Sequence, residues 1–149
     1  MNGGGGIEQA RQQHGEFQDY LTLLQSVPKL VTDPRSLSRE LPRARGFLGR
    51  VLPRHFRQEE DIVFPAVLEQ APPELRPRLE AAVAQLRREH DLLLDQALAL
   101  LDGLARLSQY ASLSDLLKLN ARVQAFGDAL RRNSQREDEE IFPHLLQFS

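Results

Sequence analysis

The sequence contains no cysteine among its 149 residues. Disulfides, thiolate zinc sites and iron–sulfur clusters are therefore excluded, because each of them needs cysteine sulfur. Any bound metal must instead be held by imidazole, carboxylate, amide or water. Ligands of this kind suit iron, manganese or zinc.

Long hydrophobic runs are also missing. No apolar stretch approaches the roughly 20 residues of a membrane-spanning helix, and the N-terminus lacks the basic flank and apolar run of a signal peptide. We therefore predict a cytoplasmic protein with no membrane partner. The inferred outer faces carry no continuous apolar stripe, so we expect a monomer or a weak homo-oligomer.

Neither sign of charge is in large excess. The chain has 19 Lys and Arg against 21 Asp and Glu, and its hydrophobic fraction is 41%. This is the composition of an ordinary globular protein of one domain. Arginine-rich pieces such as residues 42–45 are interrupted by core positions, which predicts helix surface and no nucleic-acid partner.

Patterns typical of β-strands are absent as well. Apolar residues recur every three or four positions, and prolines interrupt this pattern, which predicts four amphipathic helices. The expected helices cover about residues 7–27, 36–70, 73–107 and 112–146. We predict an all-α, up-down-up-down four-helix bundle over residues 7–149, with a metal site in its core and a flexible glycine-rich tail at residues 1–6.

Proline inside the second predicted helix is an exception to this regular pattern. Pro53 lacks a backbone N–H and crowds the preceding turn. A kink or a looser turn is therefore expected just ahead of His55.

One motif occurs twice. Residues 55–65 and 133–143 each begin with a polar residue, continue with a glutamate four positions later and end with Phe-Pro. Residues four apart lie on one face of a helix, so His55 with Glu59, and Asn133 with Glu137, each direct two coordinating groups to one place.

A single histidine precedes each copy of the motif. His14 lies 41 residues before His55, and His90 lies 43 residues before Asn133. Two similar helical hairpins would place all of these groups at the centre of a bundle and relate them by a pseudo-two-fold axis.

Each candidate ligand also has a simpler explanation. A lone histidine in an apolar stripe is commonly a hydrogen-bonded core residue, and a His/Glu pair is common on solvated helix faces. The two glutamates, however, lie on faces otherwise made of Leu, Phe, Ile and Ala, where an unpaired charge would be expensive. We therefore predict a metal site and no catalytic residue; its ligands are His14, His55, Glu59, His90 and Glu137, with Asn133 as a weak ligand.

Other polar residues near the motifs are not expected to bind the metal. The acids that flank the two glutamates, including Glu60 and Asp138, are predicted to be solvated. His144 lies about two helical turns beyond Glu137, or about 10 Å along the axis, which is too far for the same site.

These motifs resemble those of the hemerythrin-like, or HHE cation-binding, domains over nearly the whole chain. That family has a His on helix one, His-x-x-x-Glu ending in Phe-Pro on helix two, Glu-His on helix three and a second His-x-x-x-Glu before Phe-Pro on helix four. The corresponding residues here are His14, His55 with Glu59, Glu89 with His90, and Asn133 with Glu137. The resemblance implies a centre of two non-haem iron ions bridged by Glu59 and Glu137.

Asn133 departs from this family pattern, which usually has histidine there. By analogy, one iron would keep His14, His55 and both bridging glutamates. The other would keep His90, the bridges and only the amide oxygen of Asn133 or water. An amide oxygen is a weaker donor to iron than imidazole, so the second site should be weak or empty. The oxygen-carrying hemerythrins use more histidines than this chain offers, which argues against a dedicated oxygen carrier.

The resemblance suggests a protein that binds or senses iron, dioxygen or nitric oxide. Two alternatives belong to other functional classes. One is a di-iron enzyme of oxidative or nitrosative stress defence that turns over peroxide or nitric oxide, although the related repair proteins carry a cysteine-bearing segment that is missing here. The other is a bundle with one metal, held for structure.

Overall fold

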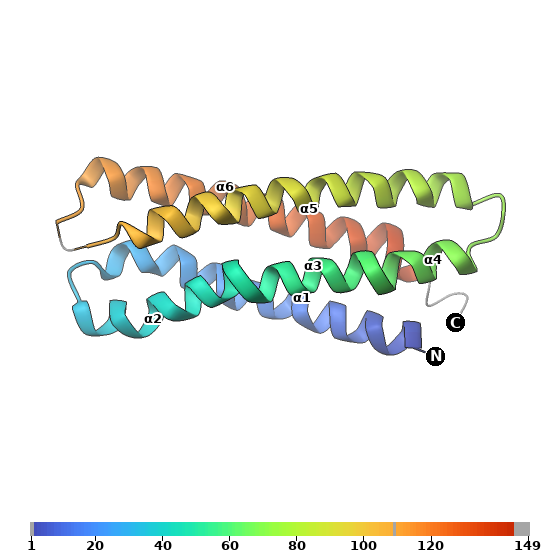
Figure 1. Ribbon diagram of the computed structural model, residues 1–149, viewed down its shortest axis with the longest axis horizontal. Coiled ribbons are helices and arrows are strands. Elements are labelled where there is room, and N and C mark those ends of the chain that lie inside the picture. Colours follow the sequence, from blue (N-terminus) through green and yellow to red (C-terminus); the bar gives the residue numbers. More distant parts are fainter. Residues whose placement is uncertain (1, 109, 145–149) are drawn as a thin grey trace.

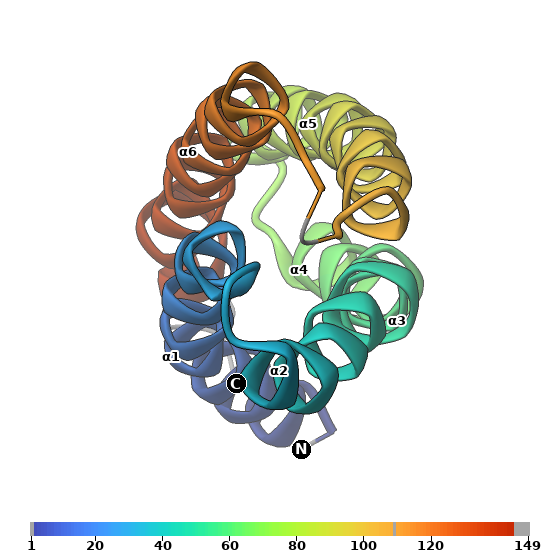
Figure 2. The same cartoon turned by 90° about the vertical axis from the view of Figure 1, so that its left-hand side faces the viewer.

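The computed structural model describes residues 2–108 and 110–144, and all of its regular structure is helical. The chain forms four antiparallel rods in up-down-up-down order, with the start of the first rod and the end of the fourth at the same end of the bundle (Figure 1). Seen end on, rods that follow one another in the chain are neighbours, and the fourth closes the ring against the first (Figure 2). The predicted all-α four-helix bundle is confirmed.

Each rod is one helix or a series of helical segments. The first rod is α1 (Asn2–Ser26), followed by a short 3₁₀ turn, η1 (Val27–Leu30). The third rod is α5 (Arg76–Ala105). The fourth is α6 (Leu113–Arg136) continued by η4 (Glu137–Ile141). The second rod consists of α2 (Pro34–Gly46), η2 (Phe47–Val51), α3 (Leu52–Gln58), η3 (Glu59–Val63) and α4 (Phe64–Gln70).

Side-chain caps explain where two of the helices begin. The Asp33 carboxylate accepts a hydrogen bond from the backbone N–H of Ser36 at the start of α2, where Pro34 occupies the first turn. The hydroxyl of Ser112 accepts one from the N–H of Asp115 at 3.1 Å, and α6 begins at the next residue. The capping start predicted at Ser112 is therefore confirmed.

Some helix boundaries differ from those predicted. The first helix begins at Asn2, so it includes the glycine run that we expected to form a tail; the flexibility of residues 1–6 stays a prediction. The third helix begins three residues late, because the carbonyl of Pro72 first accepts the N–H groups of Leu75 and Arg76 in a turn. The expected end of the fourth helix, near residue 146, lies outside the described residues.

Three of the segments, η2, η3 and η4, are π-helical turns, and each ends two residues before a proline. These prolines are Pro53, Pro65 and Pro143. Proline has no N–H for the regular helical bond, and a wider turn just upstream accommodates that missing bond. The looser turn predicted ahead of His55 is η2, whereas the turns that begin at Glu59 and Glu137 were not predicted.

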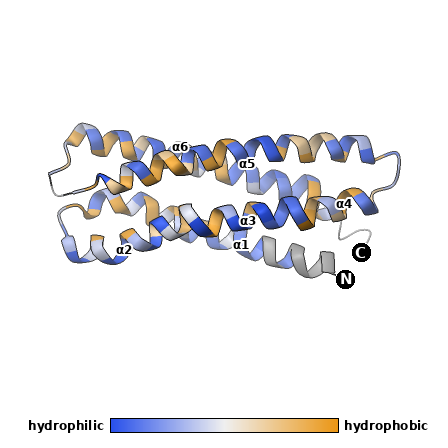
Figure 3. Cartoon of the chain, viewed as in Figure 1, coloured by the Kyte–Doolittle hydropathy of each residue, from blue (hydrophilic) through white to orange (hydrophobic). Residues whose placement is uncertain are grey.

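Two apolar clusters fill the bundle. A layer of buried polar residues separates them along the bundle axis and is called the polar layer below; it consists of His14, His55, Glu59, His90, Asn133 and Glu137. On α5, Leu86 belongs to one cluster and Leu93 to the other, with buried His90 between them. On the second rod, Phe56 and Val63 lie on either side of Glu59 in the same way. Hydrophobic and hydrophilic residues alternate along each helix (Figure 3), and most of the hydrophobic ones are buried, although a few such as Leu92 and Leu98 are exposed. None of the described helices is both long and apolar enough to cross a membrane; the cytoplasmic location stays a prediction.

The cap of α6 gives a test of the fold. We expect Ser112→Ala to lower the free energy of unfolding by about 1 kcal/mol, because the N–H of Asp115 loses its acceptor. Urea denaturation monitored by circular dichroism measures the change. The matched control is Ser114→Ala, an exposed serine in the first turn of the same helix that does not cap it. Equal effects of the two variants would show that the cap contributes nothing to stability.

Candidate metal centre

The polar layer consists of all six predicted ligand residues, and none of them is more than 8% exposed. Every rod contributes at least one. The residues and their elements are His14 on α1, His55 on α3, Glu59 on η3, His90 on α5, Asn133 on α6 and Glu137 on η4.

On one side of this layer, two imidazoles face two carboxylates. Nε2 of His14 lies 3.0 Å from Nε2 of His55, and 3.3 Å from an oxygen of each glutamate, Oε2 of Glu59 and Oε2 of Glu137. Nε2 of His55 lies 3.2 Å from the same oxygen of Glu59. One ligand atom from each of these four residues lies within 4.8 Å of the other three, a spacing that could hold a metal ion.

His90 faces the same two carboxylates from the other side. Its Nε2 lies 2.9 Å from Oε1 of Glu137 and 3.3 Å from Oε1 of Glu59. Each glutamate therefore presents one oxygen to His14 and the other oxygen to His90.

Asn133 is buried beside this group, and its amide is held by a neighbouring carboxylate. Its Nδ2 donates a hydrogen bond to Oε1 of Glu89 at 3.1 Å. The other oxygen of Glu89 accepts a hydrogen bond from Gln85 and forms an ion pair with Arg136, each at 3.2 Å.

The central carboxylates lack the hydrogen bonds that buried oxygens normally have. Among the described residues, both oxygens of Glu59 and Oε2 of Glu137 accept none with adequate geometry, although imidazole nitrogens lie close by. One imidazole N–H cannot serve several acceptors at once, and an unsatisfied buried carboxylate is costly. A cation between the imidazole nitrogens and the carboxylate oxygens would satisfy all of them. This donor set fits a borderline metal such as iron, manganese or zinc.

The outer nitrogen of each imidazole faces an oxygen atom. Nδ1 of His90 lies 3.0 Å from Oε2 of Glu60, and Nδ1 of His14 lies 3.2 Å from Oδ1 of Asp138. Nδ1 of His55 contacts Oε1 of Gln13. An oxygen acceptor at Nδ1 places the proton there and leaves the Nε2 lone pair directed at the centre, as a metal ligand requires.

The sequence interpretation missed these outer partners. Glu60 and Asp138 were expected to be solvated and were not linked to any histidine. Their side chains are 27% and 42% exposed, and each accepts a hydrogen bond from a histidine of another rod. The signal that could have found them is their shared position, since each directly follows a central glutamate.

The contacts of the two halves match pair by pair, as the predicted pseudo-two-fold axis requires. Gln13 directly precedes His14 and accepts a hydrogen bond from His55. Glu89 directly precedes His90 and accepts one from Asn133 in the same way. Asn133 thus occupies the position that His55 has in the other half, with an amide in place of an imidazole.

The charges of the centre stabilise one another in the metal-free protein. Burial would raise the pKa of Glu59, but the imidazoles of His14, His55 and His90 lower it well below its usual range. Burial would also lower the pKa of His14, but the carboxylates of Asp138 and Glu59 raise it to about 9. His14 is therefore protonated at neutral pH and must lose that proton before it can bind a metal.

Comparison with protein families agrees with this geometry. A helical bundle with a buried cluster of histidines and glutamates belongs to the class of bundle metal-site proteins. The model of the hemerythrin HHE cation-binding domain matches residues 5–145, essentially the whole chain. The chain belongs to this family, which confirms the resemblance seen in the sequence. Comparisons with curated proteins and with solved structures found no match.

The raised pKa of His14 predicts that metal uptake releases a proton. We expect Fe²⁺ binding under anaerobic conditions at pH 7.5 to displace about one proton from His14. This part of the release should vanish as the pH rises through about 9, where the metal-free residue is already neutral. Calorimetry in two buffers with different protonation enthalpies measures the released protons.

Asp138→Asn tests the cause of this release. Without the Asp138 carboxylate, the pKa of His14 should fall toward its ordinary value of 6.5, so less proton is released at pH 7.5. Glu139→Gln is the control, because Glu139 is exposed and contacts Gln135. A release that is unchanged in Asp138→Asn would contradict the assignment of the proton to His14.

Proposed function

We propose that the chain is a non-haem iron protein whose centre holds two iron ions, bridged by Glu59 and Glu137, and binds or senses dioxygen or nitric oxide. The observation that carries this proposal is the division of each carboxylate between the two sides of the polar layer. In both glutamates, Oε2 faces His14 and Oε1 faces His90. A carboxylate that presents its two oxygens to separate sets of imidazoles has the orientation needed to bridge two cations.

The two positions differ in their donors. The first position has the imidazoles of His14 and His55, whereas the second has only that of His90. Asn133 donates through Nδ2 to Glu89, so only its carbonyl oxygen remains for a metal. We therefore propose that the second position binds iron more weakly, keeps more water and is the one where a small ligand exchanges.

The surroundings support binding rather than turnover. The ring of Phe56 stacks on that of His90 with centroids 3.9 Å apart, and Phe142 stacks on His14 at 5.7 Å. These rings exclude water and hold the imidazole planes in place. Bound ferrous iron would supply the affinity for dioxygen or nitric oxide.

Acid–base groups beside the centre are already engaged. Glu60 and Asp138 each accept a hydrogen bond from a histidine, so they orient imidazoles instead of standing free to transfer protons. For this reason we favour binding or sensing over the enzymatic alternative. Turnover of peroxide or nitric oxide well above the rate of free iron would favour the enzyme.

A centre with a single metal is the second candidate. It is favoured by the group of four ligand atoms within 4.8 Å, which comes from His14, His55, Glu59 and Glu137 alone. Metal stoichiometry distinguishes the two candidates.

The first test is the iron content of protein purified anaerobically with excess iron, together with its visible absorption before and after exposure to air. We expect about two irons per chain, as in other bundle carboxylate sites.

Glu59→Gln and Glu137→Gln should each remove most of the iron while helicity is kept, because each glutamate serves both positions. Glu140→Gln, an exposed acid near the end of η4, is the control. Iron retained in both central variants would overturn the site.

Asn133→His tests the asymmetry. The new imidazole should donate to Glu89 as His55 does to Gln13, and its other nitrogen should complete the weaker position. We expect iron occupancy at that position to rise about ten-fold at limiting iron, with a shift in visible absorption. Asn120→His, on the same helix away from the centre, is the control. An unchanged occupancy and spectrum would mean that Asn133 does not face a metal.

A further inference from the structure

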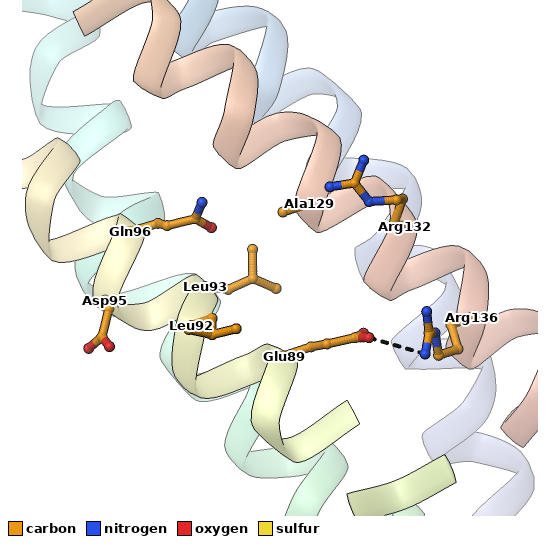
Figure 4. A pocket seen from close by; sticks show the side chains of 8 residues that line it. All are labelled: Glu89, Leu92, Leu93, Asp95, Gln96, Ala129, Arg132 and Arg136. Atoms are coloured by element: carbon orange, nitrogen blue, oxygen red, sulfur yellow. Dashed lines mark ion pairs between the residues drawn. The ribbon is translucent and has the colours of Figure 1, made fainter. Parts of the chain in front are cut away.

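A cavity of about 390 Å³ lies between α5 and α6, outside the polar layer. Figure 4 shows the side chains that matter here, with α5 on one wall and α6 on the other. They are Glu89, Leu92, Leu93, Ala129, Arg132 and Arg136. The volume is within the range of sites that bind small organic molecules.

The wall of the cavity is largely apolar. Leu93 is buried at its base, and Ala129 faces it from α6 (Figure 4). Leu92 lies at the edge with 64% of its surface exposed, which makes it one of the large hydrophobic side chains left uncovered. An apolar molecule seated between the helices would remove this surface from water.

One of the two arginines at the rim has no ion-pair partner among the described residues. Arg136 pairs with Glu89 at 3.2 Å, but Arg132 forms no ion pair with any residue in 2–108 or 110–144. In Figure 4 its guanidinium lies beside Ala129 on α6, while the carboxylate of Asp95 points away from both arginines. Arginine binds carboxylates through two parallel hydrogen bonds, so this charge selects an anionic head group.

We infer that the cavity between α5 and α6 binds a small amphipathic carboxylate. Its apolar body lies against Leu92, Leu93 and Ala129, and its carboxylate pairs with Arg132. The cavity has room for roughly a dozen non-hydrogen atoms, since a water-sized group occupies about 30 Å³. A medium-chain fatty acid or an aromatic acid has this size and this separation of charge from apolar surface.

The cavity is connected to the metal centre through one side chain. Glu89 lines the cavity, pairs with Arg136 and accepts the hydrogen bond of Asn133. A carboxylate paired with Arg132 adds a second negative charge to the rim that Glu89 also lines, and so changes how firmly Glu89 is held by Arg136 and holds the amide of Asn133. Occupancy of the cavity should therefore alter iron binding at the weaker position; this step alone rests on the proposed function.

Titration calorimetry of the full-length, iron-loaded protein with octanoate tests the binding site. We expect about one octanoate per chain with a Kd on the order of 0.1 mM, as is reasonable for a ligand of ten non-hydrogen atoms. Octan-1-ol and octylammonium share the apolar chain but lack the negative charge, and we expect them to bind at least roughly ten-fold more weakly. Equal affinity for the alcohol, or no saturable binding of octanoate, would overturn the proposal.

Two variants locate the ligand. Arg132→Gln removes the head-group partner, and Ala129→Leu fills the cavity; each should weaken octanoate binding at least roughly ten-fold. Arg131→Gln is the matched control, because Arg131 is next in sequence but contacts Asp128 and Gln18 away from the cavity. Thermal melts establish that each variant is folded. Octanoate binding unaffected by both cavity variants would place the ligand elsewhere.

The link to the metal is measured separately, by iron titration with and without saturating octanoate. We expect a several-fold change in affinity at the weaker position and none at the stronger one. An unchanged affinity at both positions would overturn the link. Octanoate binding to a protein with one iron per chain would keep the cavity site and reject the two-iron centre. Two irons per chain without octanoate binding would support the two-iron centre and reject the cavity site.

Discussion

The burial of two carboxylates in the middle of an apolar bundle is the constraint on which this structure depends. Glu59 and Glu137 are fully buried, and three of their four oxygens accept no hydrogen bond from the described residues. Such groups are tolerated only when positive charge is placed around them. Imidazoles from three rods surround them here, and a bound cation would complete the compensation. Because every rod contributes to this layer, metal binding should also stabilise the fold.

The same charges explain why the histidines need an outer layer of acceptors. An imidazole between two carboxylates can rotate or bind its proton on the wrong nitrogen, and either change would remove its lone pair from the centre. Glu60 and Asp138 prevent this by crossing from one hairpin to the histidine of the other. The hairpins therefore orient each other's histidines, so the arrangement of the polar layer depends on both hairpins packing together.

Asn133 departs from that symmetry, because the equivalent residue of the other half is His55, and the outer partners differ as well. In the first half the outer partner is the neutral amide of Gln13, whereas in the second half it is the charged Glu89, held by Arg136. The second half is also the one with a cavity beside it, lined by the same Glu89. In the proposed two-iron centre, the position with fewer imidazoles would therefore be the one next to this cavity. This arrangement suits a centre whose occupancy responds to a second ligand.

The sequence by itself determined the helical class, the register of each motif and the identity of the buried polar residues. Helical periodicity places His55 and Glu59, or Asn133 and Glu137, on one inner face whatever the rest of the chain does. Only the tertiary structure decided which oxygen faces which imidazole, which residues orient the histidines and where a cavity remains. Those features depend on how each rod is rotated about its axis and shifted along it relative to its neighbours. They also depend on the wide turns ahead of proline, which shift the helical register. Spacing within a single helix does not contain that information, because packing between helices sets it.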